Sequence, residues 1–131
     1  MNGDEDFRRE LRLRISGKIL FDEPAGRHAS IGVGGPIDVL LFPEDERETV
    51  EVIRFLRERN RPFLPVGNWT NLIVRDKGFR GTLVSFARLC GLGLRENGEK
   101  GTLIEAGAGC LLSELVSLSV REALSGMAFC A

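Results

Sequence analysis

One short loop of the chain carries residue types suited to holding an anion. Residues 67–71 read Gly-Asn-Trp-Thr-Asn and lie between two apolar segments. Gly67 and Asn68 can adopt the left-handed backbone that turns successive N–H groups toward one side, and such a concave group of donors binds phosphate. Thr70 and Asn71 add side-chain donors. If a diphosphate binds to this chain, we expect this loop to hold it.

The loop fits neither of two common nucleotide-binding motifs. The Gly-Lys-Ser/Thr of a Walker A motif is missing. A dinucleotide-binding GxGxxG turn leads into a helix, whereas this loop is expected to lead into a strand at Leu72–Val74. Taken alone, the loop is equally compatible with an ordinary hairpin connection between two strands.

Side chains for nucleophilic, acid–base or metal chemistry are scarce. His28 is the only histidine, tyrosine is absent, and no serine and aspartate of recognisable spacing accompany the histidine, so we expect a structural role for it. The cysteines at positions 90, 110 and 130 are odd in number and widely spaced, which fits neither a disulfide framework nor a zinc site. We therefore expect reduced cysteines and no metal site.

Composition and charge indicate one ordinary globular domain. The chain has 131 residues, of which 43% are hydrophobic and 28% charged, and its formal net charge is −1. A basic surface for nucleic acid or for an anionic membrane is therefore not expected. The apolar runs are too short to span a bilayer and no secretory signal opens the chain, so we expect a cytoplasmic protein without a membrane partner.

The amino-terminal segment predicts an amphipathic helix. Phe7, Leu11 and Ile15 recur every fourth position, acidic residues precede them, and Gly17 follows. The helix is expected to stop near that glycine. The arginines between the apolar positions are expected to form a solvated face.

A strand, a helix and a second strand are predicted next. The strand Ile37–Phe42 precedes Asp45, which we expect to cap the helix with Glu48 as its reciprocal partner. The second strand is expected at Phe63–Val66, after Asn60 and Pro62 close the helix, and the unit has the size of a right-handed parallel βαβ crossover. The apolar face of the helix is expected to comprise Val50, Val52, Ile53, Phe55 and Leu56.

Strands are also predicted in the middle of the chain. Leu72–Val74 and Thr82–Phe86 read as strands on either side of a turn at 76–78. Asn97-Gly98 reads as a tight turn before a strand at Thr102–Ala106.

The carboxyl-terminal segment predicts a helix and an apolar run. The helix is expected at Leu112–Leu124, with Gly126 beyond its end. The run 127–131 reads as a buried strand with nothing after it, so we expect the chain to be cut within a larger protein. The buried stripe of the helix is expected to comprise Leu112, Leu115, Val116 and Leu118.

Four segments of the chain match one family in their order and spacing. They read RHASIGVGGPIDVLLFP (27–43), PFLPVGNWTNLIVRDKGFRG (62–81), IEAGAGCLLSELV (104–116) and ALSGMAF (123–129). Together they resemble the amino-terminal part of the UDP-N-acetylenolpyruvoylglucosamine reductase family, also called UDP-N-acetylmuramate dehydrogenases. The wider group of flavoproteins with the same FAD-binding fold shares the strand-loop-strand element but less of the first segment.

The resemblance implies an α+β protein with the FAD-binding fold of these reductases. In the family, NADPH reduces FAD, and the flavin then reduces UDP-N-acetylglucosamine enolpyruvate to UDP-N-acetylmuramate for peptidoglycan. The implied parts are a helix and lead-in at 1–22, a first FAD-binding subdomain at 23–95 and the incomplete start of a second at 96–131. The family's substrate-binding arginine, proton-donating serine and glutamate lie beyond the matched part, so we expect no catalytic residue here and no activity of the chain alone.

The resemblance also implies which residues contact FAD. They are expected in the loop and in a later glycine-rich turn: Val66, Gly67, Asn68, Trp69, Thr70, Asn71, Leu72, Ala106, Gly107, Ala108 and Gly109. The family usually has small residues, often glycine, at positions 68 and 69. Since a left-handed backbone costs a non-glycine residue about 1–2 kcal/mol, we expect Trp69 to adopt an ordinary backbone with its indole over the cofactor or across the loop. The alternative is an apolar plug between loop and helix.

Three other functions remain open from the sequence. The chain fits a non-catalytic module that binds FAD or another nucleotide. It also fits the FAD-binding subunit of a molybdenum hydroxylase, which would share the loop but should not carry RHASIGVGG. The third is a structural βαβ domain whose loop binds nothing.

Overall fold

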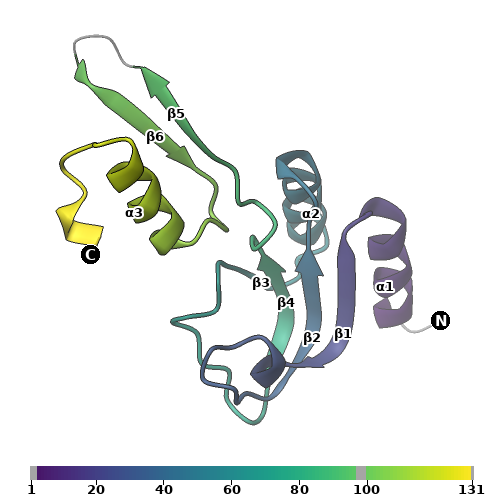
Figure 1. Ribbon diagram of the computed structural model, residues 1–131. Coiled ribbons are helices and arrows are strands. Elements are labelled where there is room, and N and C mark those ends of the chain that lie inside the picture. The colour runs from purple at the N-terminus through teal and green to yellow at the C-terminus, as the bar shows by residue number, and fades with distance from the viewer. Residues whose placement is uncertain (1–2, 97–99, 131) are drawn as a thin grey trace.

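The computed structural model describes residues 3–96 and 100–130 (Figure 1). Two sheets, three α-helices and two short 3-10 turns make up the described part. In chain order the elements are α1 (Gly3–Arg14), β1 (Lys18–Pro24), η1 (Ala25–Arg27), β2 (Pro36–Phe42), α2 (Glu46–Glu58), β3 (Phe63–Val66), β4 (Phe79–Ser85), β5 (Leu92–Glu96), β6 (Thr102–Ala106), α3 (Leu112–Arg121) and η3 (Ala128–Cys130).

The larger sheet contains the predicted strand, helix and strand. Its order is β1-β2-β4-β3, with β2, β4 and β3 parallel and β1 antiparallel to β2. The strands β2 and β3 are therefore parallel as predicted, but β4 lies between them. Their carboxyl ends lie at one edge of the sheet, which is where open α/β sheets place ligands.

The two faces of this sheet are covered differently. On one face, α1 and α2 pack over β2 and β4, and the rings of Phe7 and Phe55 stack with centroids 5.7 Å apart. On the other face, buried side chains from η1 and from the loop after β3 replace a helix. This loop-covered cluster comprises Ala25, Ile37, Leu40, Val66, Trp69, Val74 and Leu83.

The start of α2 confirms half of the predicted capping box. Asp45 accepts a 2.7 Å hydrogen bond from the Glu48 N–H. The Glu48 carboxylate accepts from the Glu44 N–H, at 2.6 Å, instead of returning to the cap residue. The apolar face also differs from the prediction, because Val50 is 48% exposed while Val52, Phe55 and Leu56 are buried.

Two strands escaped prediction, and two predicted strands are absent from residues 3–96 and 100–130. The missed strands are β1, which pairs with β2, and β5, which pairs with β6. The strand β1 runs through residues 22 and 23, where the lead-in was expected to end and the first subdomain to begin. Leu72–Val74 was wrongly predicted as a strand. Both sides of β4 are already paired, and Val74 instead enters the loop-covered cluster while Ile73 is exposed.

The hairpin β5–β6 and α3 stand apart from the four-stranded sheet, to which the segment after β4 joins them (Figure 1). Leu112 is exposed, contrary to prediction, because α3 buries only Leu118 and Ser119. The predicted strand at the end of the chain is wrong, since Ala128–Cys130 forms a 3-10 turn and Phe129 is 82% exposed. The turn predicted at 97–98 lies outside the described residues.

None of the helices in the described part of the chain is long and apolar enough to cross a membrane.

Candidate functional site

The two segments predicted to bind a cofactor lie together in the structure. The loop at 67–71 leaves the carboxyl end of β3 and meets the turn that leads into α3. The Asn68 side-chain amide donates a 3.4 Å hydrogen bond to the Cys110 carbonyl. A Cβ built on Gly67 would lie 3.5 Å from the Ala108 carbonyl oxygen. The structure thus brings both segments to the edge of the sheet where ligands are expected.

The main-chain N–H groups of this loop are unused. Within residues 3–96 and 100–130, no hydrogen bond is donated by an N–H group of residues 67–72. Thr70 and Asn71 are exposed, so their side chains add donors on the open side of the loop. In the later turn, the N–H groups of Gly107 and Gly109 donate to the carbonyls of residues 91 and 89, at 2.7 and 2.9 Å. The free donors therefore concentrate in the first segment.

Backbone packing accounts for the glycines of the later turn but not for the glycine of the loop. A Cβ on Gly107 would lie 2.0 Å from the Leu89 carbonyl oxygen, and one on Gly109 would lie 2.0 Å from that of Phe86. Close backbone packing therefore requires glycine at both positions. At Gly67 the only contact is the ordinary 3.5 Å one, so a Cβ there would occupy open space beside the free N–H groups. Packing therefore does not require glycine at position 67.

The backbone of the loop differs from the prediction in one decisive way. Trp69 has a φ of +61°, so the expected ordinary conformation is wrong. Gly67 and Asn68, the residues expected to be left-handed, are not among those with positive φ. A bulky residue in this region is a strained outlier. A tertiary interaction must therefore offset its cost.

Burial of the indole offsets this cost. Trp69 is only 6% exposed and lies in the loop-covered cluster, with its ring centroid 5.4 Å from that of His28. Its Nε1–H donates to the hydroxyl of buried Ser85 at 3.5 Å. Truncating a buried tryptophan typically costs about 3–5 kcal/mol, which exceeds the roughly 1–2 kcal/mol of a left-handed backbone. Trp69 is thus an apolar plug, between loop and sheet instead of loop and helix.

His28 has the structural environment expected for it. It ends η1, and its Nε2 lies 2.9 Å from the Glu23 carboxylate. Its ring also packs against Phe42, with centroids 5.8 Å apart. Both neighbours position the imidazole beneath the indole of Trp69.

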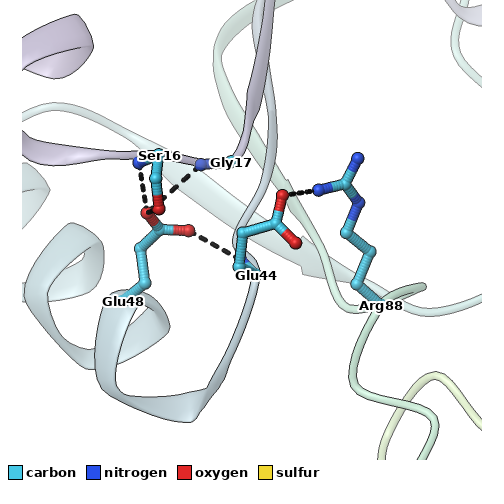
Figure 2. A network of polar contacts seen from close by, with 5 residues as sticks. All are labelled: Ser16, Gly17, Glu44, Glu48 and Arg88. Atoms are coloured by element: carbon cyan, nitrogen blue, oxygen red, sulfur yellow. Dashed lines mark hydrogen bonds and ion pairs between the residues drawn. The ribbon is translucent and has the colours of Figure 1, made fainter.

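A polar network at the same edge of the sheet was not predicted (Figure 2). The buried carboxylate of Glu48 accepts hydrogen bonds from the N–H groups of Ser16, Gly17 and Glu44, and from the Ser16 hydroxyl. The side chain of Glu44 also forms an exposed ion pair with Arg88. The network joins the α1–β1 connection, the β2–α2 connection and the segment after β4. The sequence marks the first two connections by Gly17 and Pro43 but carries no signal that Glu48 joins them.

The environment of Cys110 disfavours its thiolate. All three cysteines are free, and Cys90 is exposed. Desolvation raises the pKa of Cys110 above its ordinary value, and a hydrogen bond from the thiol to the Glu114 carboxylate adds a smaller contribution in the same direction. Cys110 is therefore a neutral thiol at pH 7. Within the described residues, no group of three or more His, Cys, Asp or Glu side chains could hold a metal ion.

A family model described as an FAD binding domain matches residues 36–129. This match includes both candidate segments, the loop at 67–72 and the turn at 106–109.

Curated relatives of the chain are named UDP-N-acetylenolpyruvoylglucosamine reductase. The protein from Syntrophus aciditrophicus (strain SB) is 45% identical over 124 residues, which cover 95% of this chain and 40% of that protein. Those from Desulforamulus reducens and Geobacter sulfurreducens are 35% and 38% identical, over 93% and 91% of this chain and 39% and 38% of each relative. The chain thus spans about 40% of the length of these relatives.

Solved structures of cholesterol oxidase from Brevibacterium sterolicum share the fold. One, of a variant enzyme, aligns with a TM-score of 0.59 and 12% identity, covering 82% of this chain and 20% of the oxidase. Another aligns with a TM-score of 0.57 and 16% identity, covering 81% and 20%. At these identities the similarity concerns the fold alone.

Proposed function

The chain belongs to the family of FAD binding domains, and from this premise we propose that it is the cofactor-binding part of a peptidoglycan-synthesis reductase. The proposed enzyme uses NADPH to convert UDP-N-acetylglucosamine enolpyruvate to UDP-N-acetylmuramate. The names of the curated relatives support this substrate class, since the match to the protein from Syntrophus aciditrophicus covers 95% of this chain. The cytoplasm is the proposed location, because the phosphorylated reactants cross membranes poorly.

The single observation that carries the proposal is that the N–H groups of residues 67–72 donate to no acceptor within residues 3–96 and 100–130. Each hydrogen bond to a charged acceptor contributes about 1.5–3 kcal/mol, so several converging donors can hold a diphosphate without a lysine or arginine. The open space beside Gly67 fits the close approach that such a ligand needs. The residues present therefore fit FAD. When bound, FAD supplies the flavin that carries the hydride.

The roles of the other proposed contacts follow from their hydrogen bonds. Thr70 and Asn71 extend the donor set, and Ala108 faces Gly67 across the site. Gly107 and Gly109 hold the turn in place through their own N–H groups and contribute no free donor. We propose that β1–β4 with α1 and α2 form a first FAD-binding subdomain, and that β5, β6 and α3 begin a second.

Two side chains that can exchange protons, those of His28 and Cys110, are engaged by neighbouring groups. Within residues 3–96 and 100–130, His28 is enclosed by Glu23, Phe42 and Trp69, and Cys110 lies against a carboxylate. A general acid must reach the reacting atom directly or through one water. We therefore propose that the proton donor belongs to the part of the enzyme that corresponds to the remaining length of the relatives.

Equilibrium dialysis with three probes tests the proposal. FAD and ADP share the diphosphate, whereas riboflavin has the flavin ring without it. The proposal predicts that the chain retains FAD and ADP in preference to riboflavin. Equal retention of riboflavin and FAD would contradict a site built for the diphosphate.

A non-catalytic flavin-binding module is the second candidate, and the enclosure of His28 by Glu23, Phe42 and Trp69 favours it. The enzyme proposal predicts NADPH oxidation, followed at the nicotinamide absorbance, when a protein spanning the full length of the relatives is given FAD and the enolpyruvyl substrate. The chain alone is predicted to show none.

A further inference from the structure

Trp69 and Ser30 anchor the loop through groups other than the N–H groups of residues 67–72. The side chain of Trp69 enters the loop-covered cluster, and its carbonyl oxygen accepts two hydrogen bonds from one residue. The donors are the N–H group of Ser30, at 3.3 Å, and its hydroxyl group, at 3.2 Å. Ser30 is 39 positions away in sequence, so a separate segment anchors the loop.

The anchor acts at the one left-handed residue of the loop. Trp69 has a φ of +61°, and a left-handed residue next to right-handed ones makes successive N–H groups converge. The hydrogen bonds from Ser30 hold the carbonyl of Trp69, while no N–H group of residues 67–72 is used within the described residues. The indole and the carbonyl therefore fix two sides of the residue and leave its neighbours' donors open.

We propose that Trp69 and Ser30 are positioning residues that set the phosphate loop in its binding conformation before the ligand arrives. Neither side chain contacts the diphosphate. The inference rests on the proposed FAD site and adds the reason why its donors are already aligned. Prior alignment matters because ordering a loop during binding reduces affinity.

Paired substitutions at Trp69 separate backbone conformation from side-chain packing. Both Trp69→Gly and Trp69→Ala remove the indole, but only glycine adopts a positive φ without strain. We expect Trp69→Ala to bind FAD about 10-fold more weakly than Trp69→Gly. This ratio corresponds to the free-energy cost of a left-handed backbone at a non-glycine residue. Equal FAD affinities of wild type, Trp69→Gly and Trp69→Ala would overturn the inference while leaving the proposed function intact.

The Ser30 hydroxyl supplies a milder test in a protein that keeps its core. Ser30→Ala retains the main-chain hydrogen bond and is expected to lower FAD affinity about 3- to 10-fold, as expected for one hydrogen bond. Ser30→Thr keeps the hydroxyl and is expected to restore the affinity. Ser113→Ala, an exposed serine of α3, is the matched control and should bind as wild type. A Ser30→Ala variant with wild-type affinity would contradict the role of this anchor.

The fluorescence of Trp69 reports the conformation directly. Trp69 is the only tryptophan and the chain has no tyrosine, so excitation of the indole monitors this loop alone. Acrylamide quenching should be low in the free protein and unchanged by ADP, which carries the diphosphate but no flavin. Strong quenching that ADP suppresses would show a loop ordered by the ligand and would overturn prior alignment. Absence of any FAD or ADP binding by the wild-type chain would overturn the proposed function itself.

Discussion

Removal of the Glu48 carboxylate should destabilise the fold by leaving main-chain donors without an acceptor (Figure 2). Glu48 is 8% exposed and accepts from three main-chain N–H groups and one hydroxyl. In Glu48→Ala these donors lose their acceptor. An unsatisfied buried donor costs about 1–3 kcal/mol, and the groove lined by Ser16, Asp45 and Glu48 admits water, so the low end applies. Three N–H groups give a loss of about 3 kcal/mol.

The assay is urea unfolding monitored by circular dichroism, with the m-value held as a check that the denatured state is unchanged. A loss of about 3 kcal/mol corresponds to a fall in Tm of roughly 10 °C for a domain of this size. Glu48→Gln keeps one acceptor oxygen and should lose about 2 kcal/mol, because its amide N–H₂ faces donors. Glu51→Gln, on the exposed side of α2, is the control and should stay within about 0.5 kcal/mol. A loss below about 1 kcal/mol for Glu48→Ala would refute the reasoning.

Three other predictions follow from the site. Gly67→Ala should fold as wild type but bind FAD at least several-fold more weakly, whereas Gly107→Ala should lower Tm because its Cβ meets a carbonyl oxygen at 2.0 Å; the opposite pattern would contradict the assignment of the open space. Arg88→Ala should change the unfolding free energy by at most about 1 kcal/mol, because its ion pair is exposed. A larger loss measured in about 0.5 M salt, which screens exposed charges, would contradict a weak surface ion pair. At pH 8, mass spectrometry should find iodoacetamide on exposed Cys90 before Cys110, whose raised pKa keeps it neutral, and the reverse order would be evidence against that environment.

The position of the site could be predicted from the sequence because it depends on local residue types. Glycine and asparagine between two apolar runs indicate a turn with free donors, and the structure places that turn at the end of β3. The conformation of Trp69 could not be predicted in the same way. Its strain is a local cost, whereas the burial that offsets it comes from η1, β2 and β4.

The missed elements share a dependence on distant partners. The strand β1 mixes charged and apolar residues, and pairing with β2 stabilises it. Glu48 reads as a helix-cap residue, yet it accepts three of its hydrogen bonds from Ser16 and Gly17, which lie 32 and 31 positions earlier. Leu72–Val74 has the composition of a strand but finds no free edge beside β4. Local patterns fix propensity, while the choice of partner depends on the complete sheet.

A ¹H–¹⁵N correlation titration of the chain with FAD tests the central claim most directly, since it detects even weak binding at single amides. The N–H groups of residues 67–72 are predicted to shift together on addition of FAD or ADP, with smaller changes at the turn 107–109. Riboflavin should leave them in place. Shifts confined to other parts of the chain, with the amides of 67–72 unmoved by FAD, would contradict a diphosphate held by this loop.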